Sequence, residues 1–145
     1  MASLHNAPRV LLVEDNDDAR ELLAFALTRE GYRLVEADSF AAGLRALREG
    51  PMVDLVISDF WLGDGDGLEM VERARQEGLL SGRPVIVWTA HPNVRARQPI
   101  VVLQKPVGID DLLATVKRLL DESDVQRGPR SDSRSPGQSV VPPRM

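Results

Sequence analysis

The stretch Leu55-Val56-Ile57, followed directly by Ser58-Asp59, is a short apolar run that ends in a carboxylate. Three similar runs occur elsewhere in the chain: Val10-Leu11-Leu12-Val13, Val85-Ile86-Val87-Trp88 and Ile100-Val101-Val102-Leu103. All four are continuous rather than alternating, which is typical of strands that are covered by helices on both faces. They therefore predict a parallel sheet in an α/β fold.

A fifth strand is predicted over Arg33-Leu34-Val35-Glu36-Ala37, where polar and apolar residues alternate. One side of such a strand meets solvent, so we expect it at an edge of the sheet.

Helical patterns separate the strands. One helix is predicted between Asn16, which can act as its N-cap, and Gly31, which can end it. Its buried face is expected to consist of Ala19, Leu22, Leu23 and Ala26. Further helices are predicted from the Ser39 cap to Gly50-Pro51, over about 68–77, and over 109–120. Only the segment from Pro92 to Pro99 separates the last two strands, which favours a single helical turn or an irregular loop.

Composition limits the domain count and the function. We divide the 145 residues into a disordered N-terminus (1–8), one folded domain (9–120) and a disordered tail (121–145) that is rich in Ser, Arg and Pro. The absence of cysteine and the presence of only two histidines argue against disulfides and zinc sites. A net charge of −4 without a basic stripe argues against direct nucleic-acid binding. No apolar run has the length of a membrane span, so a cytoplasmic protein is expected.

Acidic residues follow two of the apolar runs. Glu14 and Asp15 come after the first, and Asp59 comes after the third predicted strand. The carboxyl ends of parallel strands share one edge of a sheet, where such folds bind ligands. Three carboxylates at that edge repel one another unless a cation neutralises them, and an all-oxygen site suits Mg²⁺. Thr89 and Lys105 end the neighbouring strands, so the set suits phosphoryl transfer with Asp59 as the nucleophile.

Each of these residues also has an ordinary structural explanation. Glu14-Asp15-Asn16 could simply cap a helix, and Asp59 could be a turn residue. Lys105 could be a solvated surface charge, and Thr89 could occur at this position because threonine favours β-strands. The combination at four strand ends favours a functional site. The run Gly63-Asp64-Gly65-Asp66-Gly67 lacks the ligand pattern of a calcium loop and is expected to be a flexible turn.

The chain resembles the receiver domains of two-component response regulators over about residues 9–120. The resemblance rests on five fragments in family order: Val13-Glu14-Asp15-Asn16, Ser58-Asp59, Asp66-Gly67-Leu68-Glu69, Thr89-Ala90 and Lys105-Pro106. It implies a CheY-like, flavodoxin-like fold, with one doubly wound five-stranded parallel sheet in the order 2-1-3-4-5 and a shortened or irregular fourth helix.

The resemblance also implies a role for each site residue. Asp59 accepts the phosphoryl group, and Mg²⁺ is held by Asp59 and Asp15, by Glu14 through water, and by the backbone carbonyl of Trp61. Thr89 and Lys105 contact the phosphoryl group once it is bound. The bond between Lys105 and Pro106 is expected to be cis. A histidine kinase or phosphotransfer protein is the implied donor, and output is expected through contact with a downstream protein.

The sequence departs from the family pattern at two places. The segment between Thr89 and Lys105 is short, and Val102 occupies the position of the aromatic residue that many receivers use as a switch. Trp61 and His91 occupy positions that line the path of the attacking water, which leads us to hypothesise slow self-dephosphorylation. In the alternative, both rings point outward from their loops.

Two other functions fit parts of the pattern. A phosphatase of the Asp-nucleophile dehalogenase type also places an Asp after a strand, but it needs a second acid two residues later, where this chain has Trp61. A binding module that works without phosphorylation could retain the same fold and acids.

Overall fold

The computed structural model of the chain describes residues 7–90, 93–97 and 100–127. Within these residues, five parallel strands form one sheet in the order β2-β1-β3-β4-β5, which confirms the predicted fold class. The strands are β1 (Arg9–Val13), β2 (Arg33–Ala37), β3 (Leu55–Asp59), β4 (Val85–Thr89) and β5 (Ile100–Gln104).

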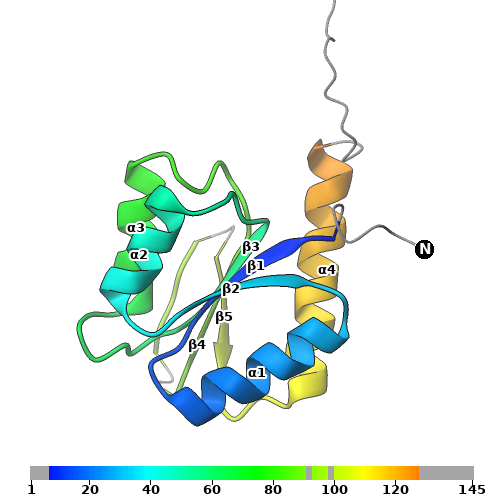
Figure 1. Cartoon of the computed structure of the whole chain (residues 1–145), viewed down its shortest axis with the longest axis horizontal. Helices are drawn as coiled ribbons and strands as arrows, with labels where there is room; N and C mark the ends of the chain where they lie inside the picture. Colours follow the sequence, from blue (N-terminus) through cyan, green and yellow to red (C-terminus); the bar gives the residue numbers. More distant parts are fainter. Residues whose placement is uncertain (1–6, 91–92, 98–99, 128–145) are drawn as a thin grey trace, which may run out of the picture.

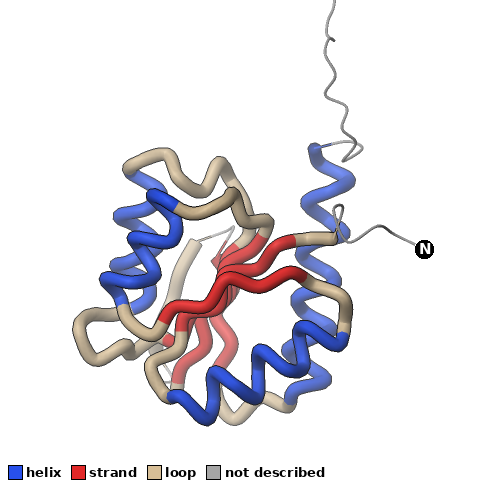
Figure 2. The backbone as a smooth tube through the Cα atoms, viewed as in Figure 1, coloured by secondary structure: helices blue, strands red, loops and turns tan. Residues whose placement is uncertain are grey.

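Helices cover both faces of the sheet (Figure 1). They are α1 (Asp17–Arg29), α2 (Phe40–Glu49), α3 (Gly67–Gln76) and α4 (Ile109–Arg127). Helices α1 and α4 pack together on one face, and α2 and α3 pack together on the other (Figure 2). Among the described helices, none combines the length and the apolar character that a membrane crossing requires.

Two apolar clusters explain why nearly every residue of the inner strands is apolar. Leu11 and Val13 of β1 face the cluster under α2 and α3, whereas Val10 and Leu12 face the cluster under α1 and α4. The same division holds along β3 and β4, because successive side chains of a strand point to opposite faces. The strand order places β2 and β5 at the two edges of the sheet. This confirms the edge position predicted for residues 33–37.

The buried face of α1 differs in part from the predicted one. Leu23 and Leu27 are buried, whereas the side chains of Leu22 and Phe25 are 58% and 61% exposed. Neighbouring helical residues point about 100° apart, so a helix that presents Leu23 to the sheet turns Leu22 toward solvent. The predicted N-cap is confirmed, since the side chain of Asn16 accepts a hydrogen bond from the Ala19 N–H at 2.8 Å.

The connection between β4 and β5 contains no helix over residues 93–97, which form a turn followed by irregular backbone. This agrees with the expectation of an irregular loop. Pro92 and Pro99, which bounded that prediction, lie outside the described residues.

The fold continues on both sides of residues 9–120, and the division of the chain into three segments stays a prediction. Helix α4 continues past residue 120 to Arg127, and the pairs Lys117–Asp121 and Arg118–Glu122 stabilise its extra turns. At the other end, Ala7 is buried and the Pro8 carbonyl accepts a hydrogen bond from the Arg33 N–H at 2.9 Å, so both residues belong to the fold. The rest of the two predicted disordered segments, 1–6 and 128–145, lies outside the described residues.

Candidate functional site

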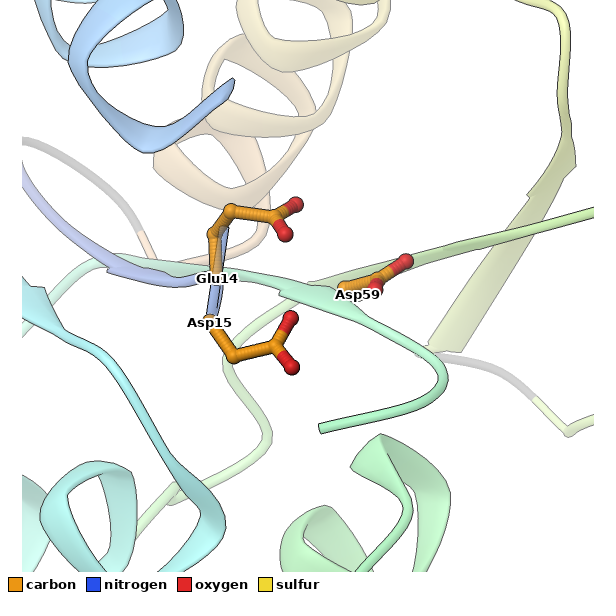
Figure 3. A group of neighbouring side chains, drawn as sticks. All are labelled: Glu14, Asp15 and Asp59. Atoms are coloured by element: carbon orange, nitrogen blue, oxygen red, sulfur yellow. The ribbon is translucent and has the colours of Figure 1, made fainter. Parts of the chain in front are cut away.

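Three acidic side chains meet at the carboxyl edge of the sheet. Glu14 and Asp15 extend from the end of β1 toward Asp59, the last residue of β3 (Figure 3). Each of them offers a carboxylate oxygen, and these oxygens all lie within 4.8 Å of one another. The predicted convergence of the three acids is therefore present in the structure.

The backbone of Glu14 is held from two sides. Its N–H donates to the Ala37 carbonyl at the end of β2 at 3.0 Å, and its carbonyl accepts a hydrogen bond from the Arg20 guanidinium at 2.8 Å. Arg20 also pairs with Asp17 within α1. Arg20 was not predicted as part of this site, although its position in the first turn of α1, directly after the acids, was a usable signal. These contacts fix the direction in which Glu14 and Asp15 leave the strand.

Glu14 is the buried member of the acidic group, with 3% of its surface exposed. Burial raises the pKa of Glu14; the hydrogen bond from the Asn16 N–H lowers it, and the charge of Asp59 raises it again. Its Oε1 atom has no hydrogen-bond partner among the described residues. A buried carboxylate oxygen without a partner is costly, and a cation or a cation-bound water at this position would satisfy it. The residues present therefore fit a hard divalent cation such as Mg²⁺.

Lys105 is the cationic partner of Asp59. Its ammonium donates to Asp59 Oδ1 at 2.8 Å, and its backbone N–H donates to the Thr89 carbonyl at 2.6 Å. The side chain of Asp59 is only 13% exposed and that of Lys105 is 35% exposed, so this ion pair is partly shielded from solvent. The bond between Lys105 and Pro106 is cis, as the resemblance implied. The structure thus brings Asp59 and Lys105 into direct contact from strands that are not neighbours.

Trp88 is a second partner of the Lys105 ammonium. The indole ring lies 5.1 Å from Nζ, measured to the ring centroid, and the residue is 8% exposed. Its backbone lies opposite Asp59 in the register of β3 and β4, and its carbonyl accepts a hydrogen bond from the Phe60 N–H at 2.8 Å. The sequence showed that Trp88 is near the site but not that it contacts Lys105, because this contact depends on how β4 and the chain after β5 pack.

Thr89 and Trp61 occupy different environments. Thr89 is the last residue of β4 and is 1% exposed. Trp61 is 61% exposed and pairs through its backbone with Asp66. This exposure favours the outward orientation of Trp61 over shielding of Asp59. His91 lies outside the described residues, so its part of the shielding hypothesis stays a prediction.

The loop between β3 and α3 is anchored at several points, unlike the flexible turn that its glycines predicted. The carboxylate of Asp64 accepts hydrogen bonds from the N–H groups of Phe40 and Ala41, at 2.8 and 3.1 Å, in the first turn of α2. Desolvation acts to raise the pKa of Asp64, but these hydrogen bonds outweigh it and hold the pKa below its usual value. The side chain of Asp64 therefore ties the loop to a helix N-terminus.

Gly67 permits a close approach behind Asp59. A Cβ atom at Gly67 would lie 2.5 Å from the Asp59 carbonyl oxygen and 2.7 Å from Ser58 Oγ. The Gly67 N–H donates to the Phe60 carbonyl at 2.6 Å, which holds the start of α3 against the end of β3. A residue without a side chain is needed here because the backbone of Asp59 leaves no room for one.

Comparison with known proteins places most of this chain in one protein family. The response regulator receiver domain family matches residues 10–117 of the chain. The transcriptional regulatory protein GlrR of Escherichia coli (strain K12) is 38% identical over 136 residues, covering 90% of this chain and 29% of GlrR. The response regulator receiver protein CpdR of Brucella abortus (strain 2308) is 29% identical over 118 residues, covering 77% of this chain and 96% of CpdR.

Solved structures agree with the sequence comparison. The receiver domain of the hybrid histidine kinase CckA is 32% identical with a TM-score of 0.69, and the match covers 77% of this chain and 98% of that domain. Several of the relatives are longer proteins. The chain spans less than a third of the length of GlrR, so the activity of that whole protein is not carried over.

Proposed function

The chain belongs to the response regulator receiver domain family, and from that premise we propose that Asp59 accepts a phosphoryl group from a phosphohistidine donor. The single observation that carries this proposal is the arrangement around Asp59. A carboxylate oxygen of Asp59 lies within 4.8 Å of an oxygen of each of two further acids, and its Oδ1 accepts a hydrogen bond from the Lys105 ammonium at 2.8 Å. Positioned charge of this kind is what phosphoryl transfer requires, since catalysis there depends on positioning and electrostatic stabilisation.

The chain's own residues orient the nucleophile. Lys105 holds Asp59 Oδ1, so the carboxylate plane is set before the donor arrives. In the reaction, a carboxylate oxygen of Asp59 forms a bond to phosphorus while the bond between phosphorus and the donor imidazole breaks, and the imidazole leaves with the electron pair. Lys105 then faces the added negative charge, and the Thr89 hydroxyl donates to a phosphoryl oxygen.

Mg²⁺ would be held by Asp15 and Asp59, by Glu14 through water, and by the Trp61 backbone carbonyl. When bound, it neutralises charge on the acids and on the phosphoryl oxygens. The buried Glu14 Oε1 without a partner among the described residues supports this assignment.

The biological role that we propose is that of a cytoplasmic switch in a phosphorelay rather than an enzyme with a released substrate. A histidine kinase or phosphotransfer protein supplies the phosphoryl group, and a downstream protein reads the phosphorylated state. Val102 offers no aromatic ring for a switch, so the signal passes through backbone movement around the loop that follows Thr89.

The test uses a small donor and intact mass measurement. Incubation with acetyl phosphate and Mg²⁺ should add about 80 Da, the mass of one phosphoryl group, to the wild-type protein and nothing to Asp59→Asn. Asp18→Asn is the matched control, because Asp18 is an exposed acid in the first turn of α1 and is expected to leave the adduct unchanged. An adduct that persists in Asp59→Asn, or that maps to another residue, would overturn the proposal.

A further inference from the structure

One face of β5 lacks the cover that the other strands have. The four apolar residues 100–103 are all only partly buried, whereas every residue of the neighbouring strand β4 is buried. On the face that α2 and α3 cover, Ile100 packs against the apolar cluster, but no helix occurs over residues 93–97, the described part of the connection that leads into β5. Parallel sheets normally carry helices over both faces. Residues 93–97, the part of this connection that the structure describes, therefore leave an apolar part of this face uncovered.

A pocket of about 580 Å³ lies at this position. Its apolar lining comes from α3, from the chain before β4, and from the first residues of β4 and β5: Leu68, Val71, Leu80, Val85 and Ile100. A volume of this size is within the usual range for a binding pocket. The pocket is separate from the acidic group around Asp59, none of whose residues lines it.

The polar residues around the pocket carry an excess of positive charge. Arg83, Arg95 and Arg97 line it together with the pair Glu72 and Arg75. Glu72 and Arg75 neutralise each other through an ion pair, which leaves the charges of Arg95 and Arg97 for a ligand. Arg95 and Arg97 are exposed, and neither forms an ion pair with another described residue.

We infer that this pocket is a docking site for an amphipathic helix of a partner protein, whose apolar residues enter the pocket and whose flanking Asp or Glu residues pair with Arg95 and Arg97. The apolar lining accepts residues spaced at i, i+3, i+4 and i+7, the pattern by which helices bind grooves. The arginines select an acidic flank, because guanidinium groups bind carboxylates through two parallel hydrogen bonds. The docked helix covers the part of this sheet face that α2 and α3 do not cover.

The C-terminal segment of this chain is a poor occupant. Residues 128–145 contain three arginines and one aspartate, so they carry the same sign of charge as the pocket. Their four prolines also disfavour a helix. A partner of opposite charge fits better. The inference goes beyond the proposed phosphoryl transfer and does not require it, so the experiment uses Asp59→Asn alongside the wild type.

The test compares two labelled peptides of about five helical turns that share one leucine stripe. One carries Glu on both flanks of the stripe and the other carries Lys, and binding to the full chain is followed by fluorescence anisotropy. The Glu peptide should bind about tenfold or more tightly than the Lys peptide, in the wild type and in Asp59→Asn alike. Amide NMR shifts caused by the Glu peptide should centre on Leu80, Val85 and Ile100.

Two variants and two matched controls locate the site. The double variant Arg95→Glu/Arg97→Glu should remove the preference for the Glu peptide, and Ala96→Trp should weaken both peptides about tenfold by filling the pocket. The control Arg29→Glu/Arg45→Glu makes the same change of charge on exposed residues of α1 and α2. The control Ala114→Trp adds the same ring at an exposed position of α4. Both control variants should bind the two peptides as the wild type does.

Equal affinity for the two peptides would overturn the inference, and so would a failure of the Glu peptide to bind. It would also be overturned if the pocket variants bound normally, or if the NMR shifts centred on the exposed Leu22 and Phe25 of α1. If light scattering showed that the peptide instead dissociates a dimer of this chain, the occupant would be a second copy and the partner assignment would be wrong.

Discussion

The ammonium group of Lys105 lies 5.1 Å from the centroid of the Trp88 indole ring while it donates a hydrogen bond to Asp59. An aromatic face attracts a cation electrostatically, and the attraction is larger when the pair is shielded from water. Trp88 is almost fully buried, so its ring offers Lys105 a fixed aromatic surface. The ring therefore helps to set where the ammonium sits relative to Asp59.

Replacing the indole should slow phosphorylation of Asp59. Trp88→Leu removes the cation–π contact, worth about 0.5–2 kcal/mol, and should lower the initial rate with acetyl phosphate by a factor of about 2 to 30. Trp88→Phe keeps an aromatic face, so its phosphorylation rate should fall less than that of Trp88→Leu. Thermal melts of both variants control for the shared loss of packing. Equal rates for the Leu and Phe variants at matched stability would show that the ring acts only through packing.

The raised pKa of Glu14 predicts a pH dependence of stability without metal. A carboxyl group whose folded-state pKa exceeds its unfolded value favours folding at low pH, and this contribution is lost as the pH rises through the folded-state pKa. Glu14→Gln removes the cost of the buried charge, so in chelator at neutral pH it should be more stable than the wild type. The difference should shrink toward acid pH. Urea unfolding measures the difference in stability between Glu14→Gln and the wild type. If this difference did not change between about pH 4 and 7, the raised pKa of Glu14 would be contradicted.

Magnesium should stabilise the wild-type protein through Asp15. At about 100 times its dissociation constant, a ligand that binds only the folded state adds about 2.7 kcal/mol of stability. Asp15→Asn removes one charged ligand and should weaken Mg²⁺ binding about tenfold or more, as followed by tryptophan fluorescence during titration. Asp18→Asn alters an exposed acid in the first turn of α1 and should leave the titration unchanged. Equal weakening by both variants would show a general charge effect instead of a site.

A methyl group at Gly67 should destabilise the fold. Gly67→Ala places a Cβ 2.5 Å from the Asp59 carbonyl oxygen, and relief of such a contact moves the backbone at a cost of about 1–3 kcal/mol. Gly108→Ala is the control, because its Cβ would meet nothing closer than 3.8 Å. Urea unfolding of the two variants should separate them by at least 1 kcal/mol; similar stabilities would mean that the contact at Gly67 is relieved without cost.

The exposure of Trp61 predicts that this ring contributes little to the lifetime of the phosphorylated state. A side chain that is 61% exposed cannot exclude water from Asp59 by packing over it. Phosphate loss from Trp61→Asn should therefore match that of the wild type within about twofold, which is small beside the effect of a closed site. A much faster loss of phosphate from Trp61→Asn would support the hypothesis that the Trp61 ring shields Asp59 from water.

Local features of this protein could be predicted from the residues themselves. The apolar runs at 10–13 and 85–88 became inner strands, the cap at Asn16 formed, and Glu14, Asp15 and Asp59 converged as their strand ends required. Each of these depends on short-range hydrogen bonding, on the two-residue period of a strand, or on the rule that parallel strands end at one edge. The first two determinants are complete within a few residues of sequence, and the third requires only that both strands belong to one parallel sheet.

Other features were decided only by tertiary structure. The exposure of Leu22, the contact of Lys105 with Trp88, and the half-covered apolar run of β5 depend on which segments pack together. The run at 100–103 reads as a strand covered on both faces, yet it lies at a sheet edge where no described helix spans 93–97. Hydrophobicity determines that a surface favours burial, but the packing partner that covers it is set by the arrangement of distant parts of the chain.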